Sequence, residues 1–403
     1  MGNNKQRHLV DRALAASDGV LRLEPAWVAR DFPPPGYRLE CVGLRGDQYD
    51  AGDRGFICER WFASVTKADN RIGPPDEGLS YLQLEDKERL TLKRAVEVAG
   101  DLILGKAYAA THAGLGRLFK VYDFSTRIPY HLHPLAKHTQ LLGRNPKEEA
   151  YYFPENLEMG PHPETFFGVH PWISEQNRHD VLLSYLQDWD SELILQHARA
   201  YLLAPGEGFH LPSGVPHAPG TAVTLELQQD SDVYAMMQAV VDGNSIPKDA
   251  MFKDVRAEDR AQYGEKFILD MIDWNTSGDP YFYENRHLTP QPAEDQPGGV
   301  EHWIYYNTTK FSGKRLIVRP GQAFTSRENG VYSVLTWQGK GRLGNQEIDG
   351  GNPGRDELLV SHERAIQPIT VENTGSIDLM IIKFFGPDIN RDVPMIPRYP
   401  SVE

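Results

Sequence analysis

The stretch Tyr130-His131-Leu132-His133-Pro134 is the most informative part of this chain. In a β-strand, residues i and i+2 point to the same face, so His131 and His133 would project together. Two imidazoles placed in this way form half of a metal site. A His-x-His pair alone also fits two surface or core histidines, so the interpretation depends on partners elsewhere in the chain.

Two later segments supply such partners. Glu164 opens an aromatic, strand-like run at residues 164–167, and His217 follows two turns and a short strand within residues 205–218. Three imidazoles and one carboxylate would hold a divalent ion and leave one or two positions for water or substrate oxygens. We therefore predict that His131, His133, Glu164 and His217 bind one divalent metal. Zinc is the expected ion, with Mn, Fe, Ni or Co as alternatives.

The rest of the chain has the texture of many short strands joined by tight turns. The 36 glycines and 29 prolines separate β-branched and aromatic runs such as 117–124, 221–227, 331–337 and 379–385, which is typical of sandwiches and barrels. Helical patterns occupy about 86–98, 174–198 and 257–271. We predict a mainly β chain of two β-barrel or jelly-roll halves with helical insertions. Its expected parts are strands and a packing helix (1–100) that serve the first barrel, the metal-binding barrel (101–240), a connecting helix and Pro/Gly linker (241–299), and a second barrel without metal (300–403).

Composition limits the function. The 403 residues carry 42 Lys plus Arg against 56 Asp plus Glu, a net charge of −14. A surface this acidic repels phosphate backbones and anionic lipids, so neither nucleic acid nor a membrane is an expected partner. Two cysteines form no disulfide framework, and the first residues contain no apolar signal core. We expect a soluble, cytoplasmic protein.

Several segments, taken in order, resemble the type I phosphomannose isomerases of the cupin superfamily. The resemblance covers about residues 59–232 and implies a bicupin fold with one metal site. Glu226 with Ser231 and Asp232 matches the family's Glu-x-x-x-x-Ser-Asp. The other matching segments are Glu59 to Ser64, Leu118-Phe119-Lys120-Val121, His131-Leu132-His133-Pro134 for Gln-x-His-Pro, His162-Pro163-Glu164 for Lys-Pro-Glu, and Leu203 to Gly220.

Four positions depart from the family pattern. His131 replaces the metal-binding Gln and can still bind a metal, whereas Pro219 replaces a Tyr. His162 replaces the family's Lys and Met236 its Arg, which removes two cations. Because Arg and Lys hold phosphate through charge-assisted hydrogen bonds, this loss favours an unphosphorylated or unusual sugar as substrate.

The resemblance therefore implies a metal-dependent aldose–ketose isomerase, or a related epimerase, acting on a small carbohydrate. Candidates for the proton-transferring group are Glu226, Lys137, His162 and His210. An Fe(II) cupin oxygenase with a more apolar pocket, and a sugar-binding protein without turnover, stay as alternatives.

The second half should lack a metal. Thr325 and Arg327 stand where a ligand pair is expected, and His362 has no partner histidine near it in the sequence. We expect this half to cover the first barrel or to mediate contacts in a homo-oligomer.

Overall fold

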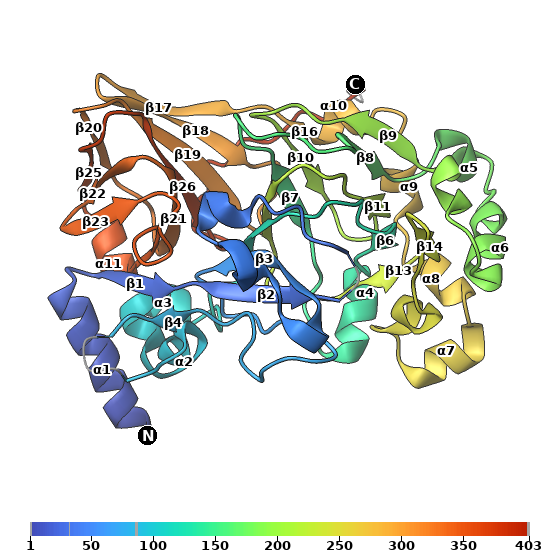
Figure 1. Cartoon of the computed structure of the whole chain (residues 1–403), viewed down its shortest axis with the longest axis horizontal. Helices are drawn as coiled ribbons and strands as arrows, with labels where there is room; N and C mark the ends of the chain where they lie inside the picture. Colours follow the sequence, from blue (N-terminus) through green and yellow to red (C-terminus); the bar gives the residue numbers. More distant parts are fainter. Residues whose placement is uncertain (1, 32, 85–87, 401–403) are drawn as a thin grey trace.

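The computed structural model describes residues 2–31, 33–84 and 88–400. The chain is mainly β, built from antiparallel sheets. Two of them contain most of the strands between residues 26 and 288 (Figure 1). The seven-stranded sheet runs in the order β16 (His287–Leu288), β10 (Gly208–Leu211), β7 (Glu149–Tyr152), β12 (Thr224–Gln228), β5 (Leu118–Tyr122), β3 (Phe56–Phe62) and β2 (Ala26–Arg30). The five-stranded sheet runs β13 (Ala235–Met236), β6 (His131–Leu132), β11 (His217–Ala218), β8 (Glu164–Phe167) and β9 (Arg199–Leu202).

The C-terminal half is built around two further sheets. The eight-stranded sheet runs β17 (Gln291–Gln296), β18 (Gly299–Tyr305), β19 (Ser312–Val318), β26 (Leu379–Phe385), β21 (Tyr332–Gln338), β24 (Glu357–Val360), β1 (Val20–Glu24) and β4 (Tyr81–Leu82). The four-stranded sheet runs β20 (Ala323–Ser326), β25 (Ile369–Asn373), β22 (Lys340–Leu343) and β23 (Gln346–Asp349). A small hairpin pairs β14 (Val240–Val241) with β15 (Asn244–Ser245).

One large apolar core joins the two halves, because the same cluster of buried side chains contains residues of the seven-stranded and the eight-stranded sheet. Phe119 of β5 stacks on Phe384 of β26 with ring centroids 4.4 Å apart. The Tyr305 hydroxyl at the end of β18 donates a hydrogen bond to the Leu225 carbonyl of β12 at 2.9 Å. The back of the seven-stranded sheet is therefore packed, and only its front is left for a cavity.

Helices cover the ends of the sheets (Figure 1). Near the N-terminus, α1 (Asn3–Ala16) packs on α2 (Leu92–Ile103). The helix expected at 86–98 thus begins at Leu92, where the Thr91 side chain accepts a hydrogen bond from the Arg94 amide; residues 86 and 87 lie outside the described residues. The remaining α-helices are α3 (Lys106–Ala109), α4 (Ala136–Thr139), α5 (Pro171–Glu175), α6 (Asp180–Asp188), α7 (Ala257–Tyr263), α8 (Lys266–Asp270), α9 (Trp274–Ser277), α10 (Phe282–Arg286) and α11 (His362–Ala365). Short 3-10 helices are η1 (Leu39–Val42), η2 (Gly46–Tyr49), η3 (Gly52–Arg54), η4 (Gln140–Leu142), η5 (Leu193–His197) and η6 (Lys248–Phe252).

Two segments differ from the sequence expectation. The Pro- and Gly-rich stretch expected to be a linker contains β17, an edge strand whose exposed position tolerates Pro292. We expected the first hundred residues to serve the first barrel, and β2 and β3 do join the sheet of β7. Strand β1 instead pairs with β24 of the C-terminal half, with Val20 opposite Val360. Within the described residues, no helix combines the length and the apolar character needed to cross a bilayer.

Candidate metal centre

Three histidines of the five-stranded sheet lie side by side. His217 of β11 is directly opposite His131 of β6 in the antiparallel register, and His133 follows immediately after β6. Their ring centroids are 4.2–5.2 Å apart, and one nitrogen of each ring lies within 4.8 Å of the other two. All three side chains are buried. The structure thus brings together three of the four predicted metal ligands.

Each of these imidazoles is oriented by a backbone carbonyl. The Nδ1 atoms donate hydrogen bonds to the carbonyls of Pro129, Val233 and Val215, from His131 at 2.7 Å, His133 at 2.8 Å and His217 at 2.9 Å. Because a carbonyl only accepts, Nδ1 carries a proton in each ring, and in the neutral ring the lone pair is then on Nε2. This is the arrangement in which histidine binds metals.

Burial keeps two of the rings neutral. It lowers the pKa of His131 well below its ordinary value, and the neighbouring His217 and His133 lower it further. It also lowers the pKa of His133 to about 3, with Lys147 adding to the effect. Neutral imidazoles are the form that a divalent ion requires.

A carboxylate from the opposite sheet completes the cluster, and it belongs to Glu149 of β7. Its Oε2 lies 3.0 Å from Nε2 of His133, and its Oε1 lies 3.0 Å from Nε2 of His217. Nε2 of His217 and Oε2 of Glu149 are buried without a hydrogen-bond partner. Lone pairs that face each other at this distance repel unless a cation lies near them. Nζ of Lys147 lies 3.0 Å from Nε2 of His133 and from Oε2 of Glu149. Nε2 of His217 has no such partner, so the donor set fits a divalent metal.

The Glu149 carboxylate is held in its charged form. Burial alone would raise its pKa, but the ammonium of Lys147, 3.0 Å from Oε2, holds that pKa well below its usual range. The Tyr151 hydroxyl also donates a hydrogen bond to Oε1 of Glu149. An anion is therefore fixed beside the three imidazoles.

Glu164, the carboxylate predicted as the fourth ligand, lies elsewhere. It is partly exposed on β8, and its Oε1 pairs with the guanidinium of Arg127. Sequence reasoning missed Glu149, although a signal was present, since Lys147-Glu148-Glu149 has the same Lys-x-Glu spacing as the Lys-Pro-Glu motif. The prediction placed this motif at residues 162–164, where the Lys is absent.

A cavity of about 60 Å³ lies in front of the cluster. This space is large enough for an ion and a few oxygen atoms of a bound molecule. Four carboxylates and three cations line it, and each cation pairs with a buried acid. The pairs are Arg30 with Glu59 at 2.8 Å, Lys120 with Glu226 at 3.4 Å, and Lys147 with Glu149 at 3.0 Å, while Asp232 lies 3.5 Å from Arg30.

Glu226 of β12, a predicted proton-transferring group, lines this cavity. Its Oε1 is buried without a hydrogen-bond partner, 3.4 Å from Nζ of Lys147. Burial raises its pKa to about 7, although Lys120 and Lys147 act to lower it. A buried carboxyl with a pKa of this kind can exchange a proton near neutral pH.

The other three predicted proton-transferring groups lie away from the cavity lining. Lys137 is exposed on α4 and pairs with Asp270 at 3.0 Å. His162 is partly exposed, with Nδ1 3.7 Å from Oε1 of Glu164. His210 of β10 is buried behind the seven-stranded sheet, where Nε2 lies 2.9 Å from Oε1 of Glu148.

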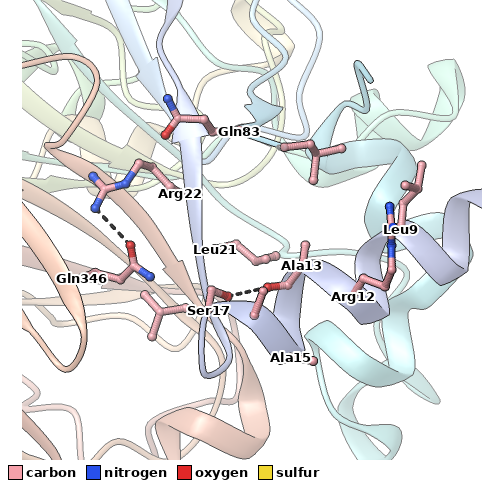
Figure 2. A pocket seen from close by; sticks show the side chains of 12 residues that line it. Leu9, Arg12, Ala13, Ala15, Ser17, Leu21, Arg22, Gln83 and Gln346 are labelled. Atoms are coloured by element: carbon pink, nitrogen blue, oxygen red, sulfur yellow. Dashed lines mark hydrogen bonds between the residues drawn. The ribbon is translucent and has the colours of Figure 1, made fainter. Parts of the chain in front are cut away.

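A larger cavity of about 640 Å³ lies between α1, β1 and the segment around Gln83 (Figure 2). Figure 2 shows Arg22 bonded to Gln346 on one side and Arg12 on α1 at the other. The described residues that line it include no histidine, cysteine or acid. It therefore offers neither metal ligands nor a carboxylate base. The smaller cavity, which has both, is the better candidate for a functional site.

In the C-terminal half, the side chains that face the interior differ from the pair expected at the ligand positions. Thr325 and Arg327 are exposed, whereas the alternate residues Ser326 and Glu328 are buried and contact Nζ of Lys383. His362 begins α11. Among the described residues, His131, His133 and His217 form the only group of three His, Cys, Asp or Glu side chains whose ligand atoms all lie within 4.8 Å of one another.

Comparison with known proteins gives similarity in structure alone. No family model matches the sequence, and no curated protein matches it. A variant of phosphomannose isomerase from Salmonella typhimurium aligns with 92% of this chain and 100% of its own at a TM-score of 0.61 and 13% identity. Mannose 6-phosphate isomerase from Bacillus subtilis aligns with 91% of this chain and 99% of its own at 0.59 and 16%. A zinc-bound mannose 6-phosphate isomerase aligns with 92% and 100% at 0.60 and 13%. At these identities the likeness concerns the fold.

Proposed function

We propose that this protein is a metal-dependent aldose–ketose isomerase with a bicupin fold, acting on an unphosphorylated sugar. The observation that carries the proposal is the buried cluster of His131, His133 and His217, with the Glu149 carboxylate 3.0 Å from Nε2 of both His133 and His217. The likeness in fold to mannose 6-phosphate isomerases, one of them zinc-bound, supports it. Zinc is the proposed ion.

The residues of the cavity fit proton transfer between neighbouring carbons. A bound divalent ion would act as a Lewis acid that polarises the sugar carbonyl and the adjacent hydroxyl. Glu226 would take the proton from one carbon and return it to the next, since its Oε1 has no partner in the cavity. Lys120 and Lys147, on either side of Glu226, would hold developing negative charge on the sugar oxygens.

The charges of the cavity support a neutral substrate. The Lys that seemed lost at His162 is present in the cavity as Lys147, and Arg30 and Lys120 lie there with it, but these three cations face four carboxylates. A phosphate dianion would have to displace a buried acid from its cation, which costs several kcal/mol. A neutral sugar hydroxyl can instead share these groups. The same charged lining argues against the oxygenase alternative, which predicted a more apolar pocket.

Metal analysis combined with a sugar screen tests the proposal. The purified chain should hold one zinc by plasma mass spectrometry, and His133→Ala should lose most of it. A panel of free hexoses and pentoses, followed by NMR, should show exchange between aldose and ketose. Glu226→Gln should keep the metal and lose at least a hundredfold in rate, with the exposed Lys137→Ala as the matched control. Turnover of mannose 6-phosphate with none of a free sugar would refute the proposed substrate class.

A further inference from the structure

Glu148, the residue between Lys147 and Glu149, points away from the cavity. In an extended strand alternate side chains face opposite sides, so Lys147 and Glu149 line the cavity while Glu148 lies behind the sheet. Glu148 is followed by β7, which has β10 on one side and β12 on the other. The contacts that hold Glu148 behind the sheet therefore also fix the start of β7, where the cavity residues Lys147 and Glu149 lie.

Glu148 is held by both halves of the molecule. Its Oε1 accepts hydrogen bonds from Nε2 of His210 at 2.9 Å and from the hydroxyl of Thr308. Thr308 belongs to the C-terminal half, in the loop between β18 and β19, and its side chain is buried. This is a direct bond between the C-terminal half and the residue adjacent to Glu149.

His210 is oriented by two further contacts. Its Nδ1 accepts from Nη1 of Arg286 at 3.2 Å and from Nδ2 of Asn307 at 3.3 Å. Because Nδ1 accepts, the proton lies on Nε2 and is donated to Glu148. Asn307 is the neighbour of Thr308, so one loop of the C-terminal half fixes both partners of Glu148.

We propose that Thr308, His210 and Glu148 are positioning residues for the metal centre, and that the C-terminal half stabilises the metal-bound geometry from behind. Glu149 must place its carboxylate against two imidazoles on the opposite sheet. Loss of the bond to Thr308 would leave the start of β7 free to shift. Groups that hydrogen-bond a metal ligand directly commonly change metal affinity 10–100-fold, and Thr308, one residue removed from Glu149, should act at the lower end of this range. This inference rests on the proposed metal site and gives His210 a role other than proton transfer.

Zinc affinity, measured by chelator competition on the full-length protein, tests the inference. Thr308→Val should weaken zinc binding about tenfold, and Glu148→Ala by the same amount or more. Glu148→Gln should restore most of the affinity, because the amide oxygen still accepts from His210 and Thr308. Thr336→Val is the matched control, since this buried hydroxyl in the C-terminal half has no hydrogen-bond partner, and it should bind zinc as the wild type does.

Spectra of the cobalt-substituted protein provide a second measurement. Thr308→Val should alter the visible Co(II) bands while far-ultraviolet circular dichroism stays unchanged, which separates a displaced ligand from general unfolding. Zinc affinities within twofold of the wild type and unaltered cobalt spectra in both Thr308→Val and Glu148→Ala would overturn this inference and leave the proposed function intact. A wild-type protein that binds no zinc would overturn both.

Discussion

At the scale of single residues, the identity of the fourth metal ligand can be tested directly. Glu149 is 1% exposed and contacts two imidazoles, whereas the partly exposed Glu164 pairs with the buried Arg127. Glu149→Gln replaces a charged ligand with a weak neutral one and should lower zinc affinity at least tenfold. Glu164→Gln should stay within about twofold. Chelator competition measures the zinc affinity of both variants. A larger loss in Glu164→Gln than in Glu149→Gln would identify Glu164 as the ligand.

At the scale of elements, helix α2 illustrates how a local signal sets a boundary. Thr91 is its N-cap, and the hydroxyl accepts from the Arg94 amide at 3.1 Å. Thr91→Ala should destabilise the first turn by about 1 kcal/mol. Hydrogen exchange of the α2 amides should then become about fivefold faster, while Thr91→Ser, which keeps the hydroxyl, should exchange as the wild type does. Equal rates in Thr91→Ala would mean that packing against α1 alone holds this end.

At the scale of the whole molecule, one buried ion cluster links strands of the two large sheets. Arg60 of β3 bonds Asp356 at 2.7 Å and Glu357 of β24 at 3.2 Å, and all three side chains are fully buried. Arg60→Ala leaves two buried carboxylates without their cation and should cost about 3–5 kcal/mol of unfolding free energy. Urea unfolding measures the loss. The exposed Arg45→Ala should change the midpoint little.

The same cluster predicts a pH dependence of stability. Burial raises the pKa of Glu357 to about 7, although Arg60 acts to lower it. A carboxyl whose pKa is higher in the folded than in the unfolded chain adds stability below its unfolded pKa of about 4.3, and this contribution is lost as pH rises through 7. The urea midpoint should therefore fall between pH 5 and 8 by less in Glu357→Gln than in the wild type. The exposed Glu363→Gln, as control, should retain the wild-type slope.

The sequence by itself determined what depends on neighbours along the chain. The period-2 spacing places His131 and His133 on one face, and the short β-branched and aromatic run 379–385 coincides with β26. Turn residues before His217 bring it to the start of β11. These features require only local backbone geometry, so they could be recognised without the fold.

Only the tertiary structure decided which distant groups meet. Glu149 and Glu164 are both carboxylates that open short strands, and the packing of the two sheets determines that Glu149 is the one facing the imidazoles. A shift of one residue reverses every side chain, so His210 lies behind its sheet and Ser326 and Glu328 lie inside in place of Thr325 and Arg327. Register and sheet packing arise from contacts between residues far apart in the chain, and a single sequence does not encode them in any local pattern.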